Sequence, residues 1–273
     1  MEIHPSAWQI LEILKNGYYP SASGARVSVA APQRAAMEST ELFTPEQLDA
    51  MFHRGAGEIG GRPPEVRVID ATTTDAAKDL QGRHGDVALL NFASAREPGG
   101  GFLRGARAQE EDLCRCGGLY SCIEKVTAYY DINRANRSAL YTDHQIYSRG
   151  VPFFRTAENA PFLETPYLAS VITAPAPNAG AIHPAEAALI RSTFERRWRD
   201  VLLIAAHHRH RTLVLGAWGC GAFRNDPEMA AETVAGWLVA PRFAGAFDRV
   251  VFAIPSFGRS AANLAVFRRV LGG

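Results

Sequence analysis

The sequence predicts a three-layer α/β/α fold with a mixed, mostly parallel sheet and a helical extension at its N-terminus. Two observations carry this prediction. After residue 60, five short apolar runs recur along the chain, and helical patterns lie between them. Such an alternation indicates a largely parallel sheet that is covered by helices. The runs are continuously apolar rather than alternating, which is typical of strands buried on both faces.

The N-terminal part is predicted to be a helical accessory region, residues 1–60, that packs on a catalytic core formed by residues 61–273. A first helix is expected over Pro5–Asn16. A second begins after Thr44, which can cap it, with Pro45 at the first helical position. This region carries too little strand pattern to form a separate domain.

The core elements follow in order. The expected strands are VRVIDATT (66–73), DVALLNFAS (86–94), YLASVITAPAP (167–177), TLVLGAWGCG (212–221) and RVVFAIPS (249–256). The expected helices are a short one over 74–81, a long one from near Gln109 (AQEEDLCRCGGLYSCIEKVTAYYDI), one opening at His183–Pro184, one capped by Asp226 with Pro227 at its first position, and RSAANLAVFRRVL near the C-terminus.

Composition excludes several classes of function. The formal net charge is +1, so no overall field would hold nucleic acid or an anionic membrane, and direct nucleic-acid binding is not expected. No apolar run approaches the roughly 20 residues that span a bilayer. The N-terminus lacks the pattern of a signal peptide. Cys114, Cys116, Cys122 and Cys220 form no C-x-x-C pair, which favours a reducing, cytoplasmic setting.

Two of the predicted strands run into glycine-rich loops, LLNFASAREPGGG and LVLGAWGCGAFRNDP. Ligands of open α/β sheets bind beyond the carboxyl ends of strands. Glycine lets backbone N–H groups approach a phosphate closely, and a helix N-terminus adds a positive dipole end. One such loop could be a simple tight turn, but two of them favour a phosphate or diphosphate ligand. Neither loop matches the nucleotide motifs G-x-x-x-x-G-K-[ST] or G-x-G-x-x-G.

Two adjacent carboxylates, Glu110 and Glu111, follow the triple glycine Gly99–Gly101 closely. Negative charge at the start of a helix is common, because the macrodipole favours it. Burial and a neighbouring carboxylate would raise the pKa of one of the two, as a general acid near neutral pH requires. The glycines would then hold a pyrophosphate, and the carboxylates would act on the attached sugar.

This combination resembles a known family. Gly99–Gly101, seven further residues and then Gln109–Glu110–Glu111 are similar to the G-G-G-x(6–8)-Q-E-E signature of poly(ADP-ribose) glycohydrolases. The surrounding NFASAREPGGGFLRGARAQEEDLCR, together with YSRGVPFFR and GAWGCGAFRNDP, resembles the bacterial-type branch of that family. The resemblance covers most of the chain from about residue 60. It implies a macrodomain fold with a helical accessory region, and hydrolysis of the ribose–ribose O-glycosidic bonds of poly(ADP-ribose) to release ADP-ribose.

The resemblance also implies roles in catalysis. Glu111 matches the catalytic glutamate, which would protonate the leaving ribose oxygen and then deprotonate the attacking water. Glu110 and Gln109 match neighbours that hold ribose hydroxyls and shape the site. Either Asn91 or Ser94 would approach the terminal ribose hydroxyls.

Further roles concern substrate binding. Gly99, Gly100 and Gly101 would lie beside the distal ribose and the diphosphate. The loop of Gly219, Cys220, Gly221 and Ala222 resembles the macrodomain diphosphate loop. Phe223 would orient the distal ribose; the alternative is a ring that fills the core beneath the loop. The pairs Tyr129–Tyr130 and Phe153–Phe154 are core residues by pattern, although either could line an adenine slot.

No metal or cofactor is expected. The histidines His207, His208 and His210 lack matching acid or cysteine spacing and are interpreted as a solvated polar turn. The expected partners are poly(ADP-ribose), ADP-ribose and poly-ADP-ribosylated proteins, in the setting of the DNA damage response, with the protein as a monomer.

Two other functions remain open: a macrodomain reader that binds ADP-ribose without cleaving it, and an ADP-ribosyl hydrolase acting on modified protein, nucleic acid or a small metabolite. A reader has no need of Gln109–Glu111, so the sequence favours the enzyme. It leaves exo- against endo-cleavage open.

Overall fold

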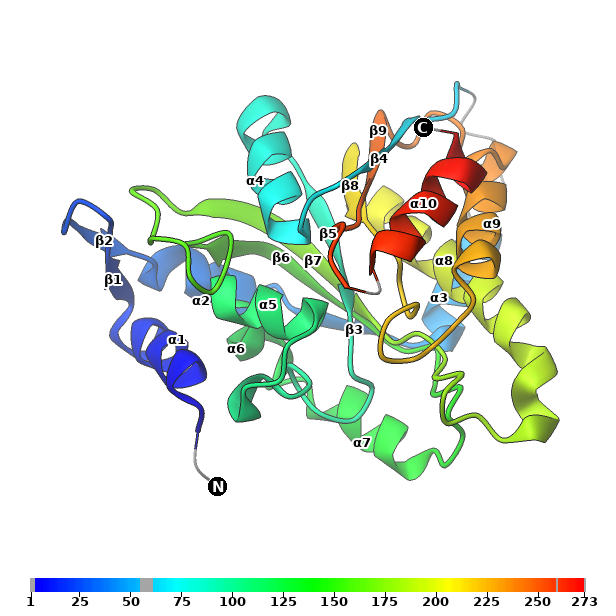
Figure 1. Cartoon of the computed structure of the whole chain (residues 1–273), viewed down its shortest axis with the longest axis horizontal. Helices are drawn as coiled ribbons and strands as arrows, with labels where there is room; N and C mark the ends of the chain where they lie inside the picture. Colours follow the sequence, from blue (N-terminus) through cyan, green and yellow to red (C-terminus); the bar gives the residue numbers. More distant parts are fainter. Residues whose placement is uncertain (1–2, 55–60, 259, 273) are drawn as a thin grey trace.

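The computed structural model describes residues 3–54, 61–258 and 260–272. In this part of the chain the main sheet has seven strands in the order β3-β6-β7-β5-β8-β9-β4 (Figure 1). The pairs β4–β9, β9–β8, β8–β5 and β5–β7 are parallel, whereas β6 is antiparallel to both β7 and β3. The prediction of a mixed, mostly parallel α/β sheet is confirmed.

The strands of this sheet are β3 (Glu41–Phe43), β4 (Glu65–Ile69), β5 (Ala88–Phe92), β6 (Gln145–Phe153), β7 (Tyr167–Ala174), β8 (Thr212–Leu215) and β9 (Arg249–Ala253). A separate hairpin joins β1 (Tyr18–Pro20) to β2 (Arg26–Ser28). The five predicted strands are all present. The sequence analysis missed β3 and β6, because neither is a plain apolar run and β6 is interrupted by a bulge between Ser148 and Val151.

The helices are α1 (Pro5–Asn16), α2 (Ala30–Glu38), α3 (Pro45–Arg54), α4 (Thr73–His84), α5 (Gln109–Cys116), α6 (Leu119–Ile123), α7 (Thr127–Ala135), α8 (Ile190–His207), α9 (Pro227–Leu238) and α10 (Ser260–Leu271). Short 3-10 segments are η1 (Phe102–Arg104), η2 (Pro184–Leu189) and η3 (Pro241–Phe243). The predicted caps are confirmed for α3, where Thr44 Oγ1 accepts from the Gln47 N–H at 3.3 Å, and for α9, where Asp226 accepts from the Glu228 N–H at 3.0 Å.

The prediction of one long helix from Gln109 was wrong, because the chain breaks at Gly117–Gly118 and continues as α6 and α7. Gly117 is extended and forms an isolated antiparallel bridge with Phe153. A Cβ on Gly117 would lie 2.6 Å from the Pro152 carbonyl oxygen. The close approach of β6 therefore ends α5. The helix expected at His183–Pro184 likewise begins as η2, and α8 proper starts at Ile190.

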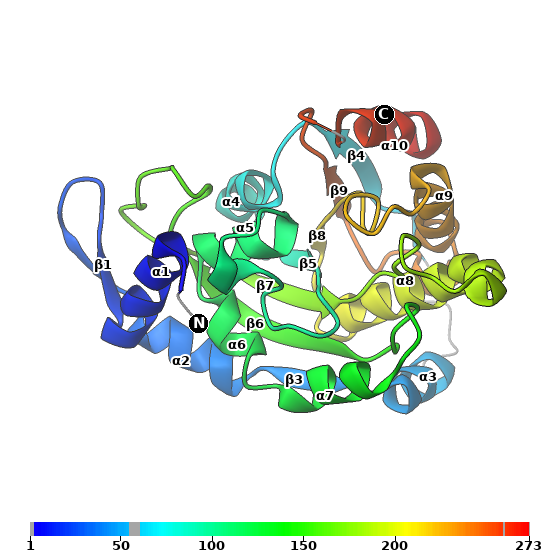
Figure 2. The ribbon, with the colours of Figure 1, turned by 60° about the horizontal axis from the view of Figure 1, so that its bottom comes forward.

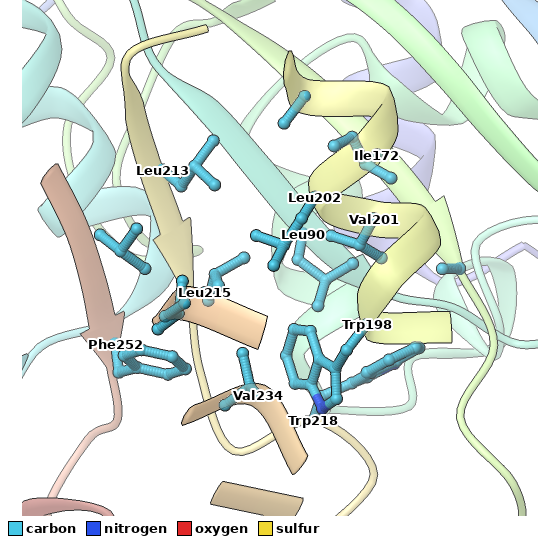
Figure 3. Close-up of a cluster of buried hydrophobic side chains, with 14 of the residues drawn as sticks. Leu90, Ile172, Trp198, Val201, Leu202, Leu213, Leu215, Trp218, Val234 and Phe252 are labelled. Carbon is cyan, nitrogen blue, oxygen red and sulfur yellow. The ribbon is translucent and has the colours of Figure 1, made fainter. Parts of the chain in front are cut away.

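Helices cover both faces of the sheet, as Figure 2 shows for α8 and α9 on one side and α5 and α6 on the other. On β5, Ala88 and Leu90 belong to one buried cluster and Leu89 to the other. The first cluster is centred on Trp198 and Trp218, whose rings meet edge-on at 4.8 Å (Figure 3). The continuous apolar run of this strand therefore reflects burial on both faces.

The N-terminal region does not only pack on the core: it contributes a strand to the main sheet and forms hydrogen bonds with core residues. Its strand β3 pairs with β6 and so forms one edge of the main sheet. The His4 N–H donates to the Leu103 carbonyl at 2.9 Å, and Arg115 Nε donates to Ser6 Oγ at 3.2 Å. Arg155 Nη1 donates to Gln9 Oε1 at 3.3 Å. The predicted domain boundary after residue 60 lies outside the described residues.

The prediction of a solvated turn holds for His207, which is exposed, but not for His210, which is buried. His210 is 4% exposed, and its ring lies between Asp86 Oδ1 and Tyr147 Oη, each at 2.7 Å from a ring nitrogen. His208 stacks on the Tyr147 ring with centroids 3.7 Å apart. Burial lowers the pKa of His210, and Asp86 acts in the opposite direction. His208 and His210 therefore belong to a polar network whose other members, Asp86 and Tyr147, are distant in sequence.

The described helices include none that is long and apolar enough to span a membrane. All four cysteines of the sequence are buried and free.

Candidate active site

The two glycine-rich loops lie at the same end of the sheet. One follows β5 and the other follows β8, and these strands are parallel neighbours. Because the carboxyl ends of parallel strands meet at one edge, the fold brings the triple glycine and the Gly219–Phe223 loop together. The arrangement that the sequence predicted for a phosphate-containing ligand is therefore present in the fold.

The triple glycine forms a tight loop against the carboxylates of α5. Gly99 and Gly100 have φ values of 66° and 59°, a left-handed conformation that favours glycine. A Cβ on Gly100 would lie 2.5 Å from Glu111 Oε1 and 3.1 Å from Glu110 Oε2. The Gly101 N–H donates to Glu111 Oε1 at 2.7 Å. Both the backbone conformation and the space thus require glycine at position 100.

Glu110 is enclosed by protein groups. It is 3% exposed, its Oε2 accepts from the Ser94 N–H at 2.7 Å, and its Oε1 accepts from Asn91 Nδ2 at 3.1 Å. Burial raises the pKa of Glu110 to about 8, although the hydrogen bonds from Ser94 and Asn91 lower it. Both oxygens of Glu110 are thus directed at the protein.

Glu111 is arranged differently. Its Oε1 is held by the Gly101 N–H, whereas its Oε2 has no hydrogen-bond partner among the described residues. The side chain is 7% exposed and lies beside the Cα of Gly100, where no side chain intervenes. One oxygen is thus fixed in place while the other keeps its capacity to bond to a substrate, which is the geometry that a positioned general acid requires.

Asn91 and Ser94 both support Glu110. Asn91, fully buried on β5, also donates from Nδ2 to Thr173 Oγ1 at 3.2 Å, and its Oδ1 has no partner in the described chain. Ser94 Oγ accepts from the N–H groups of Arg96 and Glu97 at 3.3 and 3.1 Å, which shapes the start of the glycine loop. Both residues therefore contact the site through the hydrogen bonds that they donate to the carboxyl of Glu110.

Gln109 joins α5 to the sheet. Its Oε1 accepts from the Phe92 N–H at 2.9 Å, and its Nε2 donates to the Leu90 carbonyl at 2.8 Å and to Thr73 Oγ1 at 3.2 Å. Both amide hydrogens are therefore used within the protein. The prediction that Gln109 holds a ribose hydroxyl gains no support from these contacts. They indicate instead a side chain that fixes the helix start, and with it the two glutamates.

The loop Gly219–Phe223 is tightly packed against the protein at Gly219 and open at Gly221. A Cβ on Gly219 (φ 74°) would lie 2.6 Å from Ala176 Cβ, and Asn225 Nδ2 donates to the Gly219 carbonyl at 2.9 Å. In contrast, a Cβ on Gly221 would meet nothing within 4 Å. Among the described residues, no acceptor takes the backbone N–H of Gly221, Ala222 or Phe223.

Cys220 and Phe223 belong to the loop after β8, and both contact the hydrophobic core. Cys220 is 8% exposed, and burial raises the pKa of its thiol to about 12, so the thiol is neutral. The Phe223 ring is half-buried against the Trp198–Trp218 cluster and lies 6.1 Å from the Tyr141 ring. It is therefore neither a fully buried core residue nor a free surface residue.

Comparison with known proteins identifies the family. The family described as "Microbial-type PARG, catalytic domain" matches residues 7–156, which is more than half of the 273 residues. The chain belongs to the microbial-type poly(ADP-ribose) glycohydrolases. No curated protein sequence matches this glycohydrolase.

Solved structures agree with the family. The poly(ADP-ribose) glycohydrolase of Thermomonospora curvata is 44% identical, with a TM-score of 0.92 and 97% of each chain covered. The same enzyme bound to the inhibitor ADP-HPD gives 43% identity, a TM-score of 0.88 and the same coverage. The Deinococcus radiodurans enzyme in complex with ADP-ribose is 43% identical, with a TM-score of 0.81, covering 88% of this chain and 96% of that one. The predicted family, α/β fold and enzymatic function are confirmed.

The glycohydrolase carries an exposed aromatic residue that the sequence analysis missed. Phe257 is 67% exposed in the loop after β9, the strand beside β8, and the Ser256 N–H of this loop donates to Asp70 Oδ1 at 2.7 Å. The expected aromatic pairs Tyr129–Tyr130 and Phe153–Phe154 are all buried, which confirms them as core residues. The missed signal was an aromatic residue just beyond the carboxyl end of a core strand.

No metal centre was predicted, and the described residues contain no group of three or more histidine, cysteine, aspartate or glutamate side chains that could hold an ion.

Proposed function

We propose that this site hydrolyses the ribose–ribose bond of poly(ADP-ribose) with Glu111 as the general acid and base. The observation that carries the proposal is the contrast between the neighbouring glutamates: Glu110 is saturated by protein groups, while Glu111 has one oxygen held by Gly101 and the other unpartnered. A carboxyl that exchanges a proton with substrate must keep one oxygen available for it.

The reaction then needs one carboxyl in two successive roles. Glu111 gives its proton to the bridging ribose oxygen as the bond from that oxygen to the anomeric carbon breaks. The resulting carboxylate takes a proton from the water whose oxygen adds to the anomeric carbon. A pair of carboxylates separated across the sugar is the usual glycosidase arrangement. Here the buried Glu110 occupies the adjacent position, so it acts by positioning, and the substrate's phosphates stabilise the cationic transition state.

Substrate binding follows from the second loop. The free N–H groups of Gly221, Ala222 and Phe223 would hold the diphosphate, and the N-terminus of α9 adds its dipole. Phe223 would pack on the distal ribose and hold its anomeric carbon toward Glu111. The exposed ring of Phe257 is the aromatic surface on which the adenine would stack.

The related structures support this assignment. The Deinococcus radiodurans enzyme was solved with ADP-ribose, and the Thermomonospora curvata enzyme was solved with ADP-HPD and as a glutamate-to-alanine variant. We therefore assign ADP-ribose, poly(ADP-ribose) and poly-ADP-ribosylated proteins as partners of this chain. We also propose a monomeric protein in a reducing cytoplasm, which agrees with four free, buried cysteines.

The test is incubation with purified poly(ADP-ribose), followed by chromatography of the products. We expect ADP-ribose from the wild type and intact polymer from Glu111→Gln, which keeps the side-chain shape but cannot cycle a proton. Tight binding of ADP-ribose without cleavage would identify a reader instead. Intact polymer combined with release of ADP-ribose from mono-modified protein or nucleic acid would identify an ADP-ribosyl hydrolase. Oligomeric products would indicate endo-cleavage.

A further inference from the structure

Tyr141 lies in a strained backbone conformation at the rim of the site. Its φ is 62°, a left-handed value that is rare for a bulky residue without special reason. The surrounding loop holds it there: the Asn178 N–H donates to the Ala139 carbonyl at 2.8 Å, and the Thr142 N–H donates to Asn133 Oδ1 at 2.9 Å. Strain that the surroundings maintain in this way is a reason to look for a function.

The Tyr141 ring connects the two loops of the active site. It lies 6.1 Å from the ring of Phe223, in the loop after β8. The guanidinium carbon of Arg96, in the loop after β5, lies 5.6 Å from the centroid of the same ring. Two residues, Glu97 and Pro98, separate Arg96 from the triple glycine, so the cation belongs to the loop that faces Glu111.

The positive charge at this rim is not neutralised by the protein. Arg96 donates to the Asn136 carbonyl at 3.3 Å, and within the described chain no carboxylate lies within 4.0 Å of it. Arg137, four residues before Tyr141, and Arg224, directly after Phe223, also have no carboxylate partner among the described residues. Glu97 is the nearest acidic residue in sequence, and it forms no ion pair with Arg96.

We propose that Tyr141 and Arg96 form a binding subsite for the penultimate ADP-ribose unit of the polymer, which carries the leaving oxygen of the scissile bond. This inference rests on the proposed glycohydrolase function. The groups described above hold the terminal unit, so the unit on the other side of the scissile bond needs a surface beyond Glu111 and Phe223. That unit presents an adenine face and a negatively charged diphosphate. An aromatic ring with an unpaired guanidinium over it matches both, by stacking and by ion pairing.

The test compares two substrates that share the terminal ADP-ribose. One is poly(ADP-ribose); the other is the trifluoroethyl glycoside of ADP-ribose, whose leaving group is too small to reach the subsite. For Arg96→Gln and Tyr141→Asn, we expect KM for the polymer to rise at least about fivefold. The kcat/KM for the small glycoside and the calorimetric affinity for ADP-ribose should stay within about twofold of wild type. Arg83→Gln, on α4, removes an equal charge from an exposed arginine paired with Asp79 and should change neither.

Asparagine is chosen at position 141 because it tolerates the left-handed conformation better than tyrosine does. The melting temperature of Tyr141→Asn should therefore equal or exceed that of the wild type, so a loss of polymer binding cannot be ascribed to unfolding. An unchanged KM for the polymer in both variants would overturn the subsite. An equal loss on both substrates would also overturn it, and would show that Tyr141 acts by supporting Phe223. Wild-type protein that leaves the polymer intact would refute the glycohydrolase function, and the subsite with it.

Discussion

Replacing Gly100 by alanine is the sharpest test of the catalytic loop, because one methyl group meets both the backbone and the general acid. Alanine at a φ of 59° costs about 1–2 kcal/mol. Its Cβ would lie 2.5 Å from Glu111 Oε1, so the carboxylate must move. That movement breaks or lengthens the 2.7 Å bond from the Gly101 N–H, and an intramolecular hydrogen bond contributes about 0.5–1.5 kcal/mol.

The two effects together predict a loss of about 1.5–3.5 kcal/mol in the free energy of unfolding for Gly100→Ala. Turnover should fall further than stability alone explains. A misplacement of about 1 Å in a catalytic group can reduce the rate about a hundredfold. Gly100→Val should destabilise the protein more than Gly100→Ala does, because β-branched residues avoid the left-handed conformation.

Urea unfolding and turnover of poly(ADP-ribose) at a temperature where both proteins are folded would measure these effects. Gly82→Ala is the matched control, since Gly82 lies inside α4 and a Cβ there would meet nothing within 4 Å. It should gain about 0.5–1 kcal/mol, with unchanged turnover. Gly100→Ala protein with wild-type stability and wild-type turnover would show that Glu111 does not lie against this loop.

Three further predictions concern single side chains. Glu111→Gln should bind ADP-ribose as the wild type does and lose cleavage, as measured by calorimetry and product chromatography; substantial remaining turnover would move the general acid to Glu110. Burial raises the folded-state pKa of Glu110 from 4.5 to about 8, so its contribution to stability is complete below pH 4.5 and declines as the pH rises through 8. Unfolding free energies between pH 5 and 9 should therefore fall less in Glu110→Gln than in the wild type, and parallel curves would contradict the raised pKa. Phe223→Ala should lower turnover about tenfold or more, which is roughly 1.4 kcal/mol of barrier, with a much smaller loss of ADP-ribose affinity. If the melting temperature and turnover of Phe223→Ala fall together, the ring is instead a core residue.

The parts of the fold that the sequence predicted well depend on local patterns. Apolar runs predicted five strands, of which β5, β7, β8 and β9 are mostly buried and the edge strand β4 is not, and the Asp226–Pro227 pair predicted the start of α9. The spacing between the triple glycine and the glutamates placed both groups in one site, where a hydrogen bond joins Gly101 to Glu111. These features need no knowledge of distant segments, because the periodicity and the caps lie within a few residues of one another.

The parts that the sequence missed depend on contacts between distant segments. Gly117 ends α5 because Phe153 pairs with it, and β3 exists only because β6 lies alongside it. Gln109 was expected at the ribose, yet its amide is taken by Phe92 and Leu90 of the neighbouring strand. A single sequence shows the type of each side chain, but the hydrogen-bond partners that decide its role become visible only when the chain is folded.

The contacts of α1 have a consequence for the order in which the molecule is completed. This helix is made before its partners Leu103, Arg115 and Arg155, which lie about a hundred residues or more downstream. A 12-residue helix is marginal on its own in water. During synthesis this helix is therefore expected to stay largely unfolded until the chain through Arg155 has emerged from the ribosome. An early-synthesised helix is thus completed late, when the segment that carries the catalytic loop and α5 provides Leu103 and Arg115 as its partners.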